Sequence, residues 1–484
     1  MLPDSIKLIM DSFFLFYAIS IFSLYLLLAI ISAKELRRSL NNSKITNFEA
    51  IISSPFAPMI TVIAPAYNES LTIVENIKAL LALYYPSFEI IVVNDGSIDN
   101  TLECAIAAFD LEKVPYVIDY KIPCNEIIGI YKSKKKAFNN LTIINKINGG
   151  KADALNAGID IAKGDYFISI DVDSIIDPYA LQKLIKPFLE ETDQKVIATG
   201  GVIRIANSCK IEDGQLIDIN VPDSFLARCQ VIEYNRTFLM GRLAWSRLDG
   251  LLLISGALGI FDKEIAIGCG GYFTKTVGED MELVVRMRKY MADQKLKYKV
   301  AYIPDPLCWT EAPTTLKVLG SQRNRWTRGT IDTLALHRNV FFNPKYGVMG
   351  MLSYPFWVFF EWLAPFVEIS GILYFLAIAV LGTPNWPFFT ILLFFVYFFA
   401  ITFSTYAILF DHLAYHRYKK KRMIVKLLLT AWVEPILFHP LIVYWAMCGN
   451  FDFFIRKKKT WGNMTRVGFA KKTDNIASVI PTRP

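Results

Sequence analysis

The sequence predicts an α/β domain inserted between membrane-spanning helices. Between residues 57 and 345, short runs rich in β-branched and aromatic residues alternate with patterns typical of helices. This alternation predicts a parallel sheet with crossover helices. Apolar stretches long enough to cross a bilayer precede and follow this region. Together with a hydrophobic content of 53% in a chain of 484 residues, they argue against an ordinary soluble protein.

The chain divides into four expected parts. They are an anchor (1–34), the α/β domain (57–345), a group of interfacial and transmembrane helices (349–455) and a basic tail (456–484).

The anchor is the uncharged segment Ser12–Ala33. It reaches spanning length and is longer than the apolar core of a cleaved signal peptide. Three basic residues follow it, Lys34, Arg37 and Arg38, whereas a single lysine, Lys7, precedes it. By the positive-inside rule, the α/β domain that follows should lie in the cytosol. We therefore expect a multi-pass protein of the inner or plasma membrane.

The apolar segments after the domain differ in kind. Ile369–Phe410 carries no charge, and turn-forming residues at Gly382–Asn385 divide it into a predicted helical hairpin. Met349–Val367 contains prolines and a glutamate, which favours an interfacial segment; a longer kinked span is the alternative. Ile424–Cys448 has basic clusters on both sides, so we expect a re-entrant or interfacial helix pair, with a full span as the alternative.

Four strands are expected in the first half of the domain, with helices such as Leu71–Leu83 and Ala152–Ala162 between them. The strands are Ile60–Ala64, Glu89–Val93, Leu141–Asn145 and Tyr166–Ile170. Ligands of open α/β sheets bind at the carboxyl ends of strands, so the residues that follow each strand are candidates for a site.

Polar motifs follow three of these strands. PAYNE (65–69) and NDGS (94–97) would lie side by side, which makes a nucleotide pocket plausible, although NDGS alone is also a common turn. Asp95 could accept hydrogen bonds from a ribose or a base. NGGK (148–151) opens the next helix, and its glycines and Lys151 suit a diphosphate. The alternative for NGGK is an ordinary loop with a solvated lysine.

Asp171 and Asp173 follow the strand Tyr166–Ile170 and are separated by one residue. Two carboxylates in this arrangement can serve a hard cation such as Mg²⁺ or Mn²⁺ that bridges to phosphate oxygens. The seven cysteines include no CxxC pair, and the four histidines have no carboxylates at metal-ligand spacing. A zinc site, a disulfide framework and histidine-based catalysis are therefore not expected.

Seven motifs occur in the order seen in the processive family 2 glycosyltransferases, the group of cellulose, chitin, hyaluronan and poly-N-acetylglucosamine synthases. They are PAYNES, VVNDGSIDNT, GGKADALN, DVD, GALGIF, GED and QRNRW. The chain resembles this family over residues 57–328 and in the tail at Trp461-Gly462. The resemblance implies a nucleotide-sugar-binding fold of the GT-A type and inversion at the anomeric carbon.

The resemblance also implies donor-side roles. Asp95 and Asp171 would hold the uridine, Lys151 would lie near the diphosphate, and Asp173 would bind the metal. The first motif would add three further nucleotide-sugar contacts, Pro65, Tyr67 and Glu69.

The catalytic residues implied by the resemblance are Asp280 and its neighbour Glu279. Asp280 would be the general base, because the acceptor hydroxyl must lose its proton as it attacks. Acids at this place would also be favoured by the dipole of the following helix, and both explanations can hold together.

On the acceptor side, the resemblance implies contacts from the QRNRW motif and from the loop that contains Gly256 and Ala257. Gln322, Arg325 and Trp326 would lie on an interfacial helix, with Arg325 binding the departing diphosphate and Trp326 facing a sugar ring. The alternative is an amphipathic helix that merely anchors at the membrane interface. The small residues at 256 and 257 would leave room for a glycan.

We expect the protein to transfer a sugar, N-acetylglucosamine first among candidates, from a UDP-sugar to a growing β-linked glycan. Its span pattern is closer to poly-N-acetylglucosamine and Nod-factor chitin-oligomer synthases than to bacterial cellulose synthase. The expected partners are the UDP-sugar donor, the glycan acceptor and the lipid bilayer. The small number of helices leaves two alternatives open, a complete translocation channel or one that needs a small accessory membrane subunit. Nucleic acid is not expected, because the basic residues collect beside apolar stretches. The alternatives are a transferase that adds one sugar to a lipid-linked or short acceptor, and a non-catalytic transport or scaffold component.

Overall fold

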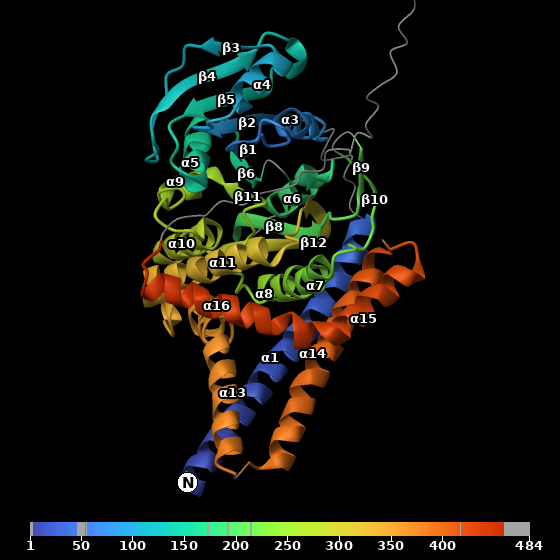
Figure 1. Ribbon diagram of the computed structural model, residues 1–484. Coiled ribbons are helices and arrows are strands. Elements are labelled where there is room, and N and C mark those ends of the chain that lie inside the picture. Colours follow the sequence, from blue (N-terminus) through green and yellow to red (C-terminus); the bar gives the residue numbers. More distant parts are fainter. Residues whose placement is uncertain are drawn as a thin grey trace, which may run out of the picture.

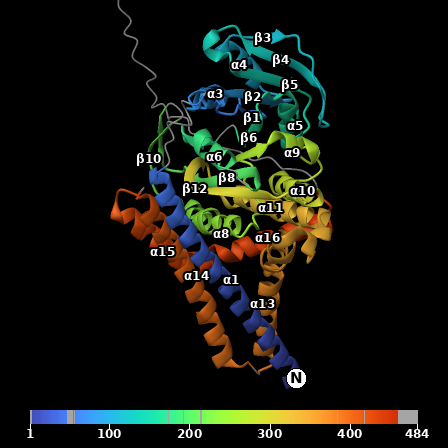
Figure 2. The same cartoon turned by 180° about the vertical axis from the view of Figure 1, so that it is seen from behind.

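The computed structural model describes residues 3–45, 54, 56–171, 174–190, 193–212, 215–382, 384–416 and 418–458. The predicted metal ligand Asp173 and the tail from residue 459 onward, with Trp461-Gly462, lie outside the described residues. A large α/β unit lies above a group of long helices that extend away from it (Figure 1). The view from behind shows the same two layers, with shorter helices between the sheet and the long helices (Figure 2).

Ten of the described strands form one sheet in the order β3-β4-β5-β2-β1-β6-β11-β8-β12-β7. Their bounds are β1 (Ile60–Ala66), β2 (Phe88–Asp95), β3 (Leu111–Val114), β4 (Ile127–Ser133), β5 (Leu141–Lys146), β6 (Tyr166–Ile170), β7 (Ile175–Ile176), β8 (Lys195–Ile205), β11 (Leu258–Asp262) and β12 (Tyr298–Thr310). A separate antiparallel ribbon consists of β9 (Lys210–Glu212) and β10 (Gln215–Asp218).

The four predicted strands are confirmed as β1, β2, β5 and β6, which are neighbours and run parallel. Their apolar runs are buried on both faces, as in Val62 and Ile91, and that pattern is typical of parallel sheets covered by helices. The predicted parallel arrangement holds for these four strands, but the sheet as a whole is mixed. β11 lies antiparallel between β6 and β8, and β4 lies antiparallel between β3 and β5. The chain reaches β11 after a helical excursion below the sheet, so no local crossover sets the direction of this strand.

The helices of the α/β unit cover both faces of the sheet. They are α3 (Ile73–Leu81), α4 (Thr101–Phe109), α5 (Lys151–Ile161), α6 (Ala180–Leu189), α7 (Phe225–Tyr234), the π-helix η2 (Asn235–Gly241), α8 (Arg242–Arg247), α9 (Lys263–Gly268), α10 (Glu279–Asp293) and α11 (Leu316–Leu336). The described residues also form three short 3₁₀ turns, η1 (Lys136–Phe138), η3 (Arg338–Val340) and η4 (Pro344–Tyr346). The predicted helices Leu71–Leu83 and Ala152–Ala162 correspond to α3 and α5 and are confirmed within two residues at every end.

Two helices in the described part of the chain are long and apolar enough to cross a membrane, α1 (Asp4–Ile45) and α14 (Trp386–Tyr415). Two bent pairs could add one span each. Met349–Trp362 meets α13 (Ala364–Val380) at 41°, and α15 (Lys421–Leu437) meets α16 (His439–Phe454) at 47°.

The predicted hairpin is confirmed as α13 and α14, which meet at the tip farthest from the sheet (Figure 1). Met349–Trp362 is made of the π-helix η5 (Met349–Ser353), α12 (Tyr354–Phe356) and the π-helix η6 (Trp357–Trp362). The expected helix pair over Ile424–Cys448 is also present, with its break at Phe438 between two prolines.

The α/β unit packs directly on the long helices. The guanidinium of Arg204 in β8 forms a buried ion pair with Asp411 near the end of α14 and also bonds Asn235. Leu28 of α1 packs against Ala244 of α8 in a small apolar cluster. The helices below therefore fix the position of the sheet above them.

Candidate active site

One cavity of about 2420 Å³ extends from the carboxyl ends of β1, β2 and β6 to side chains of α1, α14 and α15. Every predicted site residue that the structure describes lines this cavity. They are Pro65, Tyr67, Glu69, Asp95, Lys151, Asp171, Gly256, Ala257, Glu279, Asp280, Gln322, Arg325 and Trp326. The first and last of these residues, Pro65 and Trp326, are more than 250 positions apart in the sequence.

The loops after β1 and β2 bind each other, because their strands are parallel neighbours. The backbone N–H of Asn68 donates to Ser97 Oγ at 3.0 Å, and Ile98 N–H donates to Asn68 Oδ1 at 2.9 Å. Asn68 adopts a left-handed backbone with φ of 58°, a conformation that asparagine tolerates better than most residues. Glu69 accepts a bond from the Thr72 hydroxyl at 2.8 Å, so its carboxylate also organises the start of α3.

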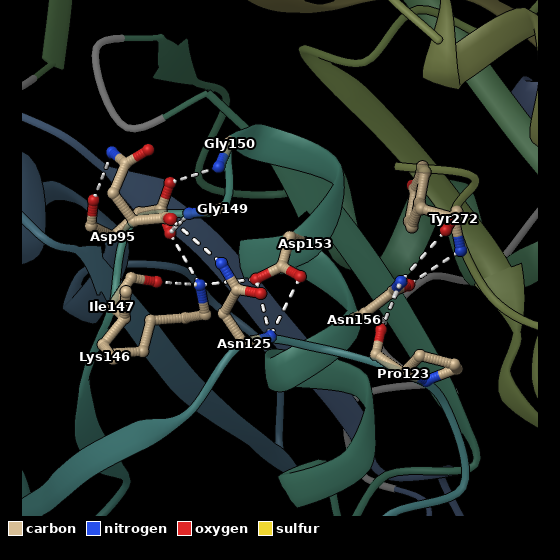
Figure 3. A network of polar contacts seen from close by, with 11 residues as sticks. Asp95, Pro123, Asn125, Lys146, Ile147, Gly149, Gly150, Asp153, Asn156 and Tyr272 are labelled. Atoms are coloured by element: carbon tan, nitrogen blue, oxygen red, sulfur yellow. Dashed lines mark hydrogen bonds and ion pairs between the residues drawn. The ribbon is translucent and has the colours of Figure 1, made fainter. Parts of the chain in front are cut away.

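Asp95 is buried, and its carboxylate is already engaged with the NGGK loop (Figure 3). It accepts bonds from the N–H groups of Gly149 at 3.0 Å and Gly150 at 2.8 Å. It also pairs with the ammonium of Lys146 at 2.7 Å. The motifs assign Asp95 directly to a nucleotide and give no role to Lys146. The sequence feature that could have pointed to Lys146 is its position as a lysine at the very end of an apolar strand.

Lys151 joins four of the motifs. Its Nζ lies 2.5 Å from Asp171 Oδ1 and 3.8 Å from Glu279 Oε1, and it donates to the carbonyl of Gly256 at 3.3 Å. Burial by itself lowers the pKa of Lys151, but the carboxylates of Asp171 and Glu279 raise it above the usual value. The ammonium therefore stays charged on the cavity wall.

Glu279 and Asp280 are the first two residues of α10, where the helix dipole favours acidic side chains. Asp280 accepts bonds from Met281 N–H at 2.9 Å and from Gly256 N–H at 3.3 Å. Burial raises the pKa of Glu279 to about 7, against the opposing effect of Lys151. Asp280 therefore faces the loop of the small residues 256 and 257, while Glu279 lies deeper.

The raised pKa of Glu279 leads to a pH-dependent effect on stability. Between its ordinary value of 4.5 and about 7, the folded protein holds a proton that the unfolded chain has lost, so stability falls as pH rises through this window. Glu279→Gln cannot lose this proton. We expect its gain in stability over wild type to grow from pH 5 to pH 8, by about 3 kcal/mol at most.

Thermal unfolding of the purified protein at pH 5 and pH 8 measures this difference. Glu264→Gln is the matched control, because Glu264 is exposed in the first turn of α9. Equal pH profiles of Glu279→Gln and wild type would contradict the assignment.

The QRNRW motif lies on α11, with Gln322, Arg325 and Trp326 toward the cavity. Arg323 also lines the cavity, where it forms an ion pair with Glu233, and its guanidinium lies 4.5 Å from the ring centre of Trp326. This contact holds the indole in place at the cavity wall.

A close backbone contact fixes α11 against the GED motif. A Cβ atom at Gly278 would lie 2.7 Å from Gly329 Cα, and one at Gly329 would lie 2.8 Å from Gly278 Cα. Any larger residue at either position would force the two segments apart. No pattern in the sequence indicates a packing role for these glycines.

Several buried polar atoms of cavity-lining residues have no hydrogen-bond partner within the described residues, among them Glu279 Oε2 and Gln322 Oε1. Buried polar groups in folded proteins are almost always paired, so such atoms are suited to a ligand.

The described residues contain no group of three or more histidine, cysteine, aspartate or glutamate side chains that could hold a metal ion. Asp171 nevertheless presents a carboxylate on the cavity wall, next to the charged Lys151. Carboxylate oxygen is the donor that hard divalent cations prefer, so the residue present fits a cation whose other ligands come from elsewhere.

Comparisons with known proteins agree with the motifs. The family model described as glycosyl transferase family 2 matches residues 61–216, and the one described as glycosyl transferase family group 2 matches residues 166–409. The poly-beta-1,6-N-acetyl-D-glucosamine synthase of Staphylococcus aureus (strain COL) is 30% identical over 327 residues, which is 67% of this chain and 66% of that protein. The Staphylococcus epidermidis synthase of the same name is 30% identical over 275 residues, 57% of this chain and 55% of that protein.

Among solved structures, the mannosyltransferase PcManGT from Pyrobaculum calidifontis, in complex with GDP-Man and Mn²⁺, is 18% identical with a TM-score of 0.49. That match covers 86% of this chain and 99% of the other. Glucosyl-3-phosphoglycerate synthase from Mycobacterium tuberculosis, in complex with Mn²⁺, UDP and phosphoglyceric acid, is 16% identical with a TM-score of 0.36 and covers 59% of this chain and 82% of the other. The second family model spans half of the chain, so the protein belongs to glycosyl transferase family 2, as its motifs and its mixed α/β sheet indicate.

Proposed function

We propose that the protein is an inverting glycosyltransferase that moves a sugar from a UDP-sugar to a growing β-linked polysaccharide at the membrane. The observation that carries this proposal is the continuity of the cavity. The predicted donor residues at the strand ends and aromatic side chains of the long helices line the same space. A transferase that extends a polymer needs such a space beyond its acceptor site.

On the donor side, Tyr67 and the loop held by Asp95 would receive the nucleotide. The positive charge of Lys151 and that of Arg325 would face the diphosphate and stabilise it as it leaves. Asp171 would help to hold the uridine, and Asp173 would hold Mg²⁺ or Mn²⁺, which when bound neutralises charge on the leaving diphosphate.

On the acceptor side, a carboxylate oxygen of Asp280 would take the proton from the attacking hydroxyl. The hydrogen bond from Gly256 N–H holds this carboxylate toward the small-residue loop, where an acceptor sugar would enter. Trp326, steadied by Arg323, offers an apolar ring face to that sugar.

The lower part of the cavity supports polymer extension over transfer of one sugar. Aromatic side chains and carboxylates from α1, η6, α14 and α15 line it together, including Tyr25, Trp357, Glu361, Phe403 and Glu434. Aromatic faces suit the apolar faces of sugar rings, and carboxylates accept bonds from sugar hydroxyls. The proposal also places the α/β unit in the cytosol, because basic residues flank the apolar segments on that side. It includes a small accessory subunit, because the described part of the chain has few long helices with which to form a channel.

Product analysis tests the proposal. Purified full-length protein in nanodiscs is given a panel of UDP-sugars with Mg²⁺ or Mn²⁺, and the product is sized and digested with specific glycosidases. The name of the staphylococcal relatives makes UDP-N-acetylglucosamine the first donor to try. We expect a long β-linked polymer. A product one sugar longer than its acceptor would support the non-processive alternative, and no UDP release from any donor would overturn the enzymatic proposal.

Asp173→Ala is expected to remove activity and the response to added metal together, because one ligand of the cation is lost. Titration of Mg²⁺ and Mn²⁺ against UDP release measures both. Asp193→Ala, an exposed aspartate after α6, is the control that should keep the wild-type titration. An unchanged metal titration in Asp173→Ala would count against the ligand role.

A further inference from the structure

A fully buried ammonium group lies behind the donor loops (Figure 3). Lys146 ends β5, and its side chain has no exposed surface. Its Nζ lies 2.7 Å from Asp95 Oδ1 and 2.5 Å from Asp153 Oδ1, and it donates to the carbonyl of Ile147 at 2.6 Å. An ammonium has three protons, so these three acceptors use its full capacity.

Each of the two carboxylates holds backbone N–H groups of a neighbouring loop. Asp95 holds those of Gly149 and Gly150. Asp153, in the first turn of α5, holds that of Asn125 at 3.0 Å. The network therefore joins the end of β2, the NGGK loop and the loop before β4 (Figure 3).

The two donor loops also touch directly. Asn148 Nδ2 donates to the backbone carbonyl of Asp95 at 2.7 Å. A Cβ atom at Gly96 would lie 2.7 Å from Asn148 N, and Gly96 has a φ of 66° that favours glycine. A small displacement of Asp95 would therefore move Asn148, Gly150 and Lys151, which line the cavity.

Without Lys146, two buried carboxylates would face each other with no opposing charge. An unpaired buried charge is costly, and removal of one member of a buried ion pair leaves such a charge behind. Asp95 would then turn toward solvent, which lies on the cavity side, and release Gly149 and Gly150.

We propose that Lys146 is a positioning residue of the donor pocket, which holds Asp95 so that the NDGS and NGGK loops are arranged for the nucleotide before it binds. This inference rests on the proposed function, because it treats the pocket as a nucleotide site. Lys146 acts through Asp95 and does not touch the ligand.

The test compares UDP binding by full-length protein in nanodiscs for Asp153→Asn and for the double variant Lys146→Met/Asp153→Asn. The double variant has the same net charge in the network as wild type, −1, since it loses one positive and one negative charge. The amide oxygen that the substitution places at position 153 can still accept the bond from Asn125 N–H. The comparison therefore isolates the ammonium.

We expect the dissociation constant for UDP to rise at least tenfold in the double variant relative to Asp153→Asn, and the KM for the UDP-sugar to rise in parallel. The kcat should change less than threefold, because the reacting groups are untouched. Asp160→Asn is the matched control, since Asp160 also lies on α5 and holds backbone N–H groups, of Lys121 and Ile122, away from the cavity. Equal UDP affinity of the two Asp153 variants would overturn the proposal.

Hydrogen exchange of the wild-type protein gives a second measurement that needs no variant to fold. Peptides covering residues 147–151 should be protected in the absence of nucleotide, because Asp95 already holds Gly149 and Gly150. Complete exchange within seconds, with protection only after UDP is added, would overturn the proposal. Absence of UDP binding by wild type would instead refute the proposed function, and the exchange pattern would still decide whether the loops are ordered in advance.

Discussion

Asp280→Asn is expected to reduce turnover by about 10²- to 10⁴-fold, the usual contribution of a general base. The amide has nearly the shape of the carboxylate but cannot accept the proton of the acceptor hydroxyl. UDP affinity should change less than threefold, because Asp280 lies on the side of Gly256 and not at the nucleotide loops. The kcat from UDP release and the dissociation constant for UDP are the two measurements.

Asp332→Asn is the control for this variant. Asp332 lies on α11 but is not among the residues that line the cavity, so its amide should leave both quantities unchanged. Turnover of Asp280→Asn at the wild-type rate would refute the base assignment. A loss of UDP affinity equal to the loss of turnover would assign Asp280 to the donor site instead.

Gly329→Ala is expected to reduce turnover by about 10²-fold, because a shift of about 1 Å between reacting groups can have an effect of this size. The new Cβ would lie 2.8 Å from Gly278 Cα and 3.0 Å from Gly278 N. Both are backbone atoms at the start of α10, so α11 would have to move away from the GED motif. Arg325 and Trp326 would move with it, while the loops after β1 and β2 would stay.

Gly278→Ala reaches the same contact from the other side and should have the same effect. Gly241→Ala is the control, since a Cβ there would meet nothing closer than 3.5 Å. Turnover and UDP affinity are measured together. Turnover within threefold of wild type in both variants would show that the distance between GED and QRNRW is not critical.

Much of the site follows from local sequence. β1, β2, β5 and β6 are apolar runs of strand length, so their existence and type could be predicted from composition. Parallel strands end at the same edge of a sheet, and the motifs after them therefore had to lie near one another. For this reason the predicted residues that follow these strands, from Pro65 to Asp171, share one cavity wherever the structure describes them.

The long apolar helices could also be predicted from the sequence. The length of the uncharged runs in α1 and in the α13–α14 hairpin is enough to predict helices that could span a membrane. The prolines at 435 and 440 marked the break between α15 and α16.

Only the tertiary structure decided which side chains meet across long sequence separations. The antiparallel entry of β11, the tie from Lys146 to Asp95, the contact of Gly278 with Gly329 and the continuity of the cavity into the helices all depend on such pairs. A motif specifies its own residues and the local backbone, and these are properties of a few consecutive positions. The glycosyltransferase motifs and the apolar helices were therefore readable in the sequence, whereas the distances between the motifs are set by packing, which no local pattern encodes.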